Sequence, residues 1–213
     1  FFEKKKNEPK YKKALAIRVI LKSKSELKIN EQNISLMLGS NSHIVFYPIN
    51  KKKEINMVCI IRSKKYDPDN IKSLVENTVL KENPNLKIIF DNEIKSWPLY
   101  FTPQILPSSN KKVFYIGDAF NGFLPTLAQG AGQSIESAYE IFNLLKEDKL
   151  GSANTYFEER SKRAKIIRRR SNLNFFVFHF SSMIMQKIRN IFLKFLVKRK
   201  TFIEGYLGKV YKN

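Results

Sequence analysis

The 213-residue sequence lacks several features that define common classes of protein. It has one cysteine, Cys59, which excludes an internal disulfide framework and fits a reducing compartment. Because Val58 and Ile60 flank it, we expect a buried structural thiol. No run of about 18 apolar residues occurs, so no ordinary membrane span is expected. The start, FFEKKKNEPKYKK, has no initiator methionine and no apolar stretch that would make a signal peptide. We therefore expect a cytoplasmic protein, and a sequence that begins inside a longer chain.

Acidic residues are also scarce, because 39 Lys and Arg face only 19 Asp and Glu and leave a net charge of +20. None lies between Arg160 and Lys200. Such an excess attracts polyanions, but we favour the interpretation that these are solvated helix faces. Nucleic-acid binding is not expected, since zinc-finger spacing, an RNP-like aromatic motif and a Gly-x-x-Gly loop are all missing. A second interpretation is docking on an anionic membrane at its inner face, helped by Phe175, Phe176, Phe178 and Phe180.

The first third of the chain is rich in short β-prone runs. Polar turns such as GSNS and NKKKE separate these runs, which predicts an antiparallel sheet. The runs are LAIRVIL, ISLML, HIVFYPI and INMVCIIR. A proline-rich segment, WPLYFTPQILP, is better suited to an extended edge or crossover than to a central strand.

Helical spacing of apolar residues appears in three further places. PDNIKSLVENTVLKEN has this spacing after Asp67 or Asp69, either of which can cap a helix. Two basic helices are predicted near the end of the chain, from Phe157 to about Phe178 and from Met183 to about Val197.

The stretch VFYIGDAFNGFLPTLAQGAGQSIESAYEIFNLL joins an apolar run to an amphipathic helix. We expect Val113–Ile116 to be a buried strand, Gly117 to turn the chain away from it, and Asp118 to accept hydrogen bonds. Pro125 stiffens the loop, and Gln129–Gly132 form a flexible turn directly before the helix. Such a turn presents unbonded N–H groups at the positive end of a helix dipole, where negative charge is stabilised.

This ordered set resembles the second flavin-binding motif of the FAD-dependent aromatic-ring hydroxylases. The similarity is greatest to the salicylate hydroxylase-like branch, whose pattern is roughly Gly-Asp-Ala-Ala-His-Pro-x-x-Pro-x-x-Ala-Gln-Gly-Ala. The segments MLGSNSHIVFYPI, WPLYFTP and YFEERSKRAKIIRRRS resemble other parts of the family. The resemblance implies an α/β fold, in which an antiparallel substrate-domain sheet is joined to the last strand and helix of a Rossmann-like FAD-binding domain and then to C-terminal helices.

The resemblance also implies the roles of individual residues. Asp118 would contact the ribityl or pyrophosphate part of FAD, and the Gln129–Ala131 backbone would face the pyrimidine edge of the flavin. NADH or NADPH would reduce the flavin, and O2 would supply the oxygen atom added to an aromatic or quinone-type ring, with no catalytic side chain or metal required. The implied cofactor-binding residues are Gly117, Asp118, Pro125, Ala128, Gln129, Gly130 and Ala131, and the implied substrate pocket includes Phe46, Pro48 and Asn121, with Phe120 and Phe123 nearby.

The sequence departs from the family pattern at several points. Asn121 replaces the usual His, Gly122 a Pro and Ser137 an Asp. The family's Gly-x-Gly-x-x-Gly unit is missing, so we interpret the chain as a C-terminal portion that binds FAD weakly alone. Its predicted parts are residues 1–104 (substrate-domain sheet and helix), 105–147 (second FAD-binding segment) and 148–213 (basic helices). The alternatives are a catalytically silent flavin-binding or interaction protein, and a membrane-surface hydroxylase of a prenylated ring.

Overall fold

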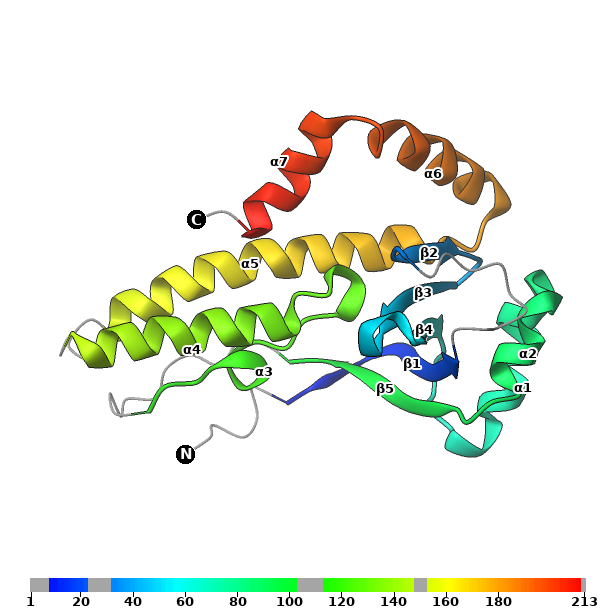
Figure 1. Ribbon diagram of the computed structural model, residues 1–213, viewed down its shortest axis with the longest axis horizontal. Coiled ribbons are helices and arrows are strands. Elements are labelled where there is room, and N and C mark those ends of the chain that lie inside the picture. The colour runs from blue at the N-terminus through cyan, green and yellow to red at the C-terminus, as the bar shows by residue number, and fades with distance from the viewer. Residues whose placement is uncertain (1–7, 23–31, 103–112, 148–152, 212–213) are drawn as a thin grey trace. The chain divides into compact units, whose positions relative to one another are not determined.

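The computed structural model describes residues 8–22, 32–102, 113–147 and 153–211 (Figure 1). The chain forms two compact units. The first unit takes its described residues from Phe1–Lys10, Tyr100–Phe175 and Phe195–Asn213, and the second takes them from Tyr11–Leu99 and Phe176–Lys194. The predicted division into three consecutive segments stays a prediction.

A five-stranded sheet lies mainly in the second unit, with strand order β2-β3-β4-β1-β5. Strand β4 pairs antiparallel with both β1 and β3, and β2 pairs antiparallel with β3. This confirms the predicted antiparallel sheet. The proline-bearing segment forms the edge strand β5, a position where proline is tolerated because an edge strand needs ladder hydrogen bonds on one side only. The strands are β1 Lys10–Lys22, β2 Ser35–Leu38, β3 Ser42–Ile49, β4 Glu54–Arg62 and β5 Lys95–Phe101.

Short helices cover one face of this sheet. The side chains between the sheet and these helices form the core of the second unit. Side chains alternate along β1 and β4, so every second residue points to that face. Asp67 caps the helical segment as predicted, since its side chain accepts the Asp69 N–H at 3.1 Å. The short helices are η2 Pro68–Asn70, α1 Ile71–Val75, the π-turn η3 Glu76–Leu80, η4 Pro84–Leu86 and α2 Lys87–Phe90. The core includes Leu15, Ile17, Val19, Ile44, Phe46, Ile55, Met57, Cys59, Ile61, Ile71, Val75 and Ile89.

Cys59 is fully buried in this core. Burial raises the pKa of its thiol, because the charged thiolate would lose its hydration. The structural role predicted for Cys59 is confirmed.

Longer helices make up the rest of the chain. Helices α4 and α5 run side by side in the first unit (Figure 1). Helices α5 and α6 confirm the two basic helices expected from the sequence, whereas α3 and α7 were not predicted. The helices are α3 Gly117–Phe120, α4 Gly130–Lys146, α5 Ala153–Phe178, α6 Met183–Leu196 and α7 Lys200–Tyr211, with a 3-10 turn η5 at Pro125–Leu127.

The expected strand at Val113–Ile116 is wrong. Ile116 has extended backbone angles, with φ −129° and ψ 162°, but no strand in the described ranges pairs with this segment. An isolated extended segment cannot form a ladder, whatever its β-propensity. Its side chains are used in packing instead, since the ring of Phe114 stacks on that of Phe157 at 5.7 Å.

Among the residues described, no helix combines the length and the apolar character needed to cross a bilayer.

Candidate functional site

Gly117 brings the start of α3 against α4. Its φ is +56°, in the left-handed region that favours glycine. A Cβ added there would lie 2.6 Å from Ser134 Oγ and 3.2 Å from Ser134 Cβ. Both the backbone angle and the close approach therefore require glycine at this turn, which supports the predicted turn function of Gly117.

Asp118 follows in the first turn of α3 and is exposed. A carboxylate at the first turn of a helix lies near the partial positive charge of the N–H groups. Because its oxygens are open, Asp118 is free to accept a hydrogen bond from a ligand hydroxyl.

The start of α4 is also open. Gln129 occupies the N-cap position, but its side chain makes no capping hydrogen bond. The first N–H groups of a helix have no intrahelical acceptor, and here they belong to Gly130, Ala131 and Gly132. A Cβ added at Gly130 or Gly132 would meet nothing within 4 Å. The α4 start therefore offers space and N–H donors to a group that carries negative charge.

Gly117 and Gly132 provide a matched test of whether the α3 turn requires glycine. We expect Gly117→Ala to lower the free energy of unfolding by about 1–3 kcal/mol, because alanine must adopt a left-handed φ and displace Ser134. Gly132→Ala should be neutral or stabilising by up to about 1 kcal/mol, because alanine is a better helix former. Urea unfolding followed by circular dichroism compares them. Equal effects of the two substitutions would contradict this assignment of Gly117.

The loop between α3 and α4 is fastened to α5. Thr126 Oγ1 donates to the carbonyl of Ser171 at 2.7 Å, and Asn174 Nδ2 donates to the carbonyl of Thr126 at 3.1 Å. Pro125 begins η5, and the N–H of Ala128 donates to the Pro125 carbonyl at 3.0 Å. Ala128 has a left-handed φ of +51°, which turns the chain into α4. The loop therefore has a defined shape before any ligand is considered.

The three departures from the family pattern are all accommodated by packing. Asn121 is 1% exposed, and its Oδ1 accepts a hydrogen bond from Arg168 Nη2. A Cβ at Gly122 would lie 3.0 Å from Thr102 Oγ1, so a larger residue would crowd this contact. Ser137 is buried and donates to the carbonyl of Gln133 at 2.7 Å. Asn121 and Ser137 thus have hydrogen-bond partners in this chain, and Gly122 allows the close approach of Thr102.

A buried arginine joins α4 to α5. Arg160 Nη1 donates to Glu136 and to Glu140, each at 3.2 Å. Its Nη2 donates to the carbonyl oxygen of Gln133 at 3.0 Å and to Gln133 Oε1 at 2.9 Å. Arg163 also pairs with Glu136, at 2.9 Å. Gln133 and Glu136 lie in the first two turns of α4, so this network fixes the helix whose start is open.

The interpretation of residues 160–200 as solvated helix faces is therefore wrong for several arginines. Arg160 has a side chain that is only 5% exposed. Arg168 bonds to Asn121 and lies 4.9 Å from the centroid of the Phe101 ring. Arg170 donates to the carbonyl of Tyr206 in α7. The charge run masked these internal roles, because a sequence pattern alone does not separate a buried arginine from a solvated one.

The predicted substrate-pocket residues are not gathered in one unit. Phe46 and Pro48 belong to the second unit, and Asn121 to the first. Phe46 is 1% exposed and packs with Ile44 in the core under the short helices. The opposite sheet face carries a polar pair that sequence reasoning missed, in which Arg18 Nε donates to the buried Asn56 Oδ1.

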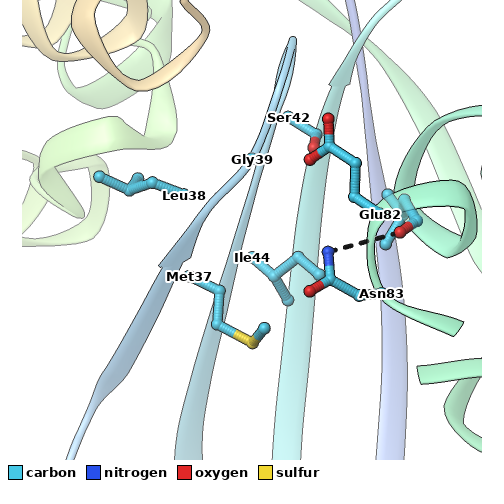
Figure 2. A pocket seen from close by; sticks show the side chains of 8 residues that line it. Met37, Leu38, Gly39, Ser42, Ile44, Glu82 and Asn83 are labelled. Carbon is cyan, nitrogen blue, oxygen red and sulfur yellow. Dashed lines mark hydrogen bonds between the residues drawn. The ribbon is translucent and has the colours of Figure 1, made fainter. Parts of the chain in front are cut away.

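A pocket of about 190 Å³ lies in the second unit, and Figure 2 shows the side chains that line it. None of the predicted site residues lines it. Its polar groups already have partners within the protein, because Glu82 accepts the N–H of Ser40, in the turn before β3, at 3.0 Å, and Asn83 Nδ2 donates to the Val79 carbonyl at 3.5 Å. The lining residues are Met37, Leu38, Gly39, Ser42, Ile44, Val79, Glu82 and Asn83. We interpret it as a crevice in the helix-to-sheet packing.

Comparisons with known proteins agree with the sequence resemblance. No protein-family model matches the chain. A curated relative, 3-amino-4-hydroxybenzoate 2-monooxygenase PtmB3 of Streptomyces platensis, is 27% identical over 163 residues, which cover 72% of this chain and 41% of that protein. Among solved structures, Klebsiella pneumoniae HpxO complexed with FAD and uric acid matches with a TM-score of 0.76 and 12% identity, over 96% of this chain and 54% of that one. A salicylate hydroxylase substrate complex matches with a TM-score of 0.68 and 17% identity, over 87% of this chain and 53% of that one.

The fold of the described residues is therefore similar to that of about half of the HpxO and salicylate hydroxylase structures, in agreement with the resemblance found in the sequence. The chain spans about half the length of the proteins it matches.

Proposed function

We propose that the chain is part of an FAD-dependent monooxygenase, which uses NADH or NADPH and O2 to hydroxylate an aromatic or quinone-type ring. The observation that carries the proposal is the open α4 start, where Gly130–Gly132 present unbonded N–H groups beside a turn that requires Gly117. The curated relative, named as a hydroxybenzoate monooxygenase, and the FAD complex of HpxO support this choice.

The residues present fit the cofactor. Asp118, exposed at the start of α3, would accept a hydrogen bond from the ribityl or pyrophosphate part of FAD. The Gln129–Ala131 backbone would face the pyrimidine edge of the flavin ring. Bound FAD supplies hydride acceptance from the nicotinamide and reaction with O2.

The chain's own contribution is positioning and electrostatic stabilisation. N–H groups at the α4 start would stabilise negative charge on the pyrimidine edge, because they already point outward and need no reorganisation. The Arg160 network and the Thr126 contact to α5 hold that helix and loop in place. The chain therefore needs no nucleophilic side chain for this chemistry.

Substitution of Asp118 tests the proposal. Asp118→Ala removes a charge-assisted hydrogen bond worth roughly 1.5–3 kcal/mol, so the affinity for FAD should fall about ten- to a hundredfold. Asp118→Asn should lose less, because the amide oxygen still accepts. Flavin fluorescence polarisation measures affinity, and circular dichroism checks that each variant is folded.

The control is a carboxylate away from the loop. Glu140 on α4 is unsuitable because it accepts a hydrogen bond from the buried Arg160. Glu158 is exposed on α5, and Glu158→Gln should leave FAD affinity unchanged. If Asp118→Ala binds FAD as tightly as the parent, the α3 turn is structural only and the proposed contact is wrong.

Flavin binding without hydroxylation is the second candidate. The burial of Asn121, held by Arg168 instead of facing an open pocket, favours it. The two candidates differ in turnover: the monooxygenase oxidises NADH or NADPH and consumes O2 when an aromatic ring is added. A protein with FAD bound that neither nicotinamide reduces would support the silent alternative. The expected attraction to an anionic membrane concerns a different surface, on helix α6.

A further inference from the structure

Helix α6 carries an exposed apolar stripe. Ile184, Ile188, Ile191 and Phe192 recur at helical spacing and are between 55% and 72% exposed. Residues three and four apart share one face of a helix, so these four side chains form a continuous strip, called here the α6 stripe. An apolar strip of this kind, on a helix that is otherwise anchored, marks a surface that contacts something else.

Another face of α6 is anchored to the ends of α5 and β2. Arg189 is 3% exposed, and its guanidinium donates to the carbonyl oxygens of Phe178 at 3.1 Å, Leu38 at 3.3 Å and Gly39 at 3.5 Å. All four residues belong to the second unit. The helix therefore cannot turn the α6 stripe inward without breaking these bonds.

Basic residues flank the stripe. Lys187 and Lys194 are exposed on α6, and at about 100° per residue both lie on the same side of the stripe. No acidic residue lies on α6 itself. The exposed surface of this helix is thus apolar and basic at once.

We propose that α6 docks the protein on anionic membrane surfaces, with the α6 stripe at the boundary of headgroups and acyl chains and the lysines among the headgroups. This partner satisfies both features, because basic amphipathic helices bind anionic lipid through apolar burial and charge together. A second copy of the chain would instead bring like-charged lysines together. The 14 residues of α6 extend about 21 Å, too short for the roughly 30 Å hydrocarbon core, so the helix lies along the surface.

The structure thereby moves the membrane surface away from the phenylalanines first suggested for it. Phe175 is buried, and Phe178 and Phe180 are half-buried, so only Phe176 of that group is exposed. The proposal rests on α6 and is independent of flavin chemistry.

Vesicle sedimentation of the whole protein tests the proposal. Binding should be strong to equimolar phosphatidylcholine and phosphatidylglycerol, weak to phosphatidylcholine alone, and reduced by salt. The double variant Lys187→Gln/Lys194→Gln should partition about thirtyfold less onto the vesicles. Each lysine near an anionic surface contributes about 1 kcal/mol of binding free energy, and the loss of two corresponds to that factor. Ile188→Ser/Phe192→Ser should also lose at least about tenfold, because two exposed apolar side chains no longer enter the bilayer.

Matched controls separate α6 from general charge and hydrophobicity. Lys64→Gln/Lys65→Gln removes two exposed lysines elsewhere, and Ile135→Ser/Tyr139→Ser removes two similarly exposed apolar side chains at the same spacing on α4. Both should bind vesicles like the parent. Equal binding to both lipid mixtures, no binding to either, or an effect of the controls as large as that of the α6 variants would overturn the proposal. The proposal would also be overturned if the protein self-associates without binding lipid and the Ile188→Ser/Phe192→Ser variant abolishes that self-association.

Discussion

Arg160→Met should lower the free energy of unfolding by about 2–4 kcal/mol, because it deletes a buried cation that four hydrogen bonds hold. Methionine keeps most of the side-chain volume, so the loss reports the polar network more than a cavity. The side chain of Gln133 loses the Arg160 donor, its carbonyl keeps only the donor from Ser137, and Glu136 and Glu140 each lose a partner. The cost stays below that of a fully buried pair, because both carboxylates are more than a third exposed and Glu136 keeps Arg163.

Lys162, which lies two residues after Arg160 on α5, offers a matched comparison. Its ammonium pairs with Glu159 at 2.7 Å, but both side chains are more than 60% exposed. Exposed pairs contribute little, so Lys162→Met should change stability by less than about 0.5 kcal/mol. Urea unfolding followed by circular dichroism compares the two variants. Similar losses would mean that Arg160 is no more structural than a surface residue.

The network also matters for the proposed cofactor site. Arg160 acts on Gln133 and Glu136, in the turns directly after the open start of α4. An N-terminus stabilises a charge only if its N–H groups are held in place. Arg160 would thus be a positioning residue for the α4 start, although it lies outside the loop motif in the sequence.

The sequence predicted elements whose signal is local. Short β-prone runs separated by polar turns predicted strands such as β1 and β4, and Asp67 followed by Pro68 predicted the helix start, because β-propensity, turn residues and capping are properties of a few neighbouring residues. The turn at Gly117 was also recognised, since only glycine tolerates its left-handed φ easily.

What the sequence did not predict depends on distant partners. Val113–Ile116 has the composition of a strand but no neighbouring strand in the described part of the chain. Phe46 was expected near a substrate, yet alternation with Ile44 in β3 points it into the core. The internal arginines needed acceptors 20 and more residues away in sequence, as with Arg160 and Glu140. Glu136 and Glu140, four apart on an amphipathic helix, were the one available signal for that network.

Two buried histidines lie side by side in the second unit. His43 Nδ1 and His179 Nε2 lie 3.1 Å apart, and both rings are almost fully buried. Phe178 packs edge-on against His43 at 5.3 Å between ring centroids. The nearby charged groups are Arg189, which donates to the Phe178 carbonyl, and Glu82, which acts electrostatically on Arg189. No carboxylate among the described residues bonds to the His43 ring.

Burial, and secondarily the neighbouring His179, lowers the pKa of His43 from 6.5 to about 3. The unfolded chain then binds more protons than the folded chain between these two values, so stability rises with pH across this window. The neutral His43 imidazole makes its full contribution to the free energy of unfolding above pH 6.5, and that contribution declines as the pH falls toward 3. From this one group we expect the free energy of unfolding to be about 2 kcal/mol lower at pH 5 than at pH 8.

The measurement is clean because the chain has only these two histidines. Ordinary carboxylates titrate mainly below pH 5 and lysines above pH 8, so histidines dominate the interval between. His43→Gln keeps a hydrogen-bonding side chain opposite His179 but does not titrate, and it should therefore flatten the pH dependence between pH 5 and 8. Urea unfolding at both pH values gives the slope for each protein. If His43→Gln keeps the parent's full slope, the buried imidazole of His43 is not its source, since lost packing alone would lower stability equally at both pH values.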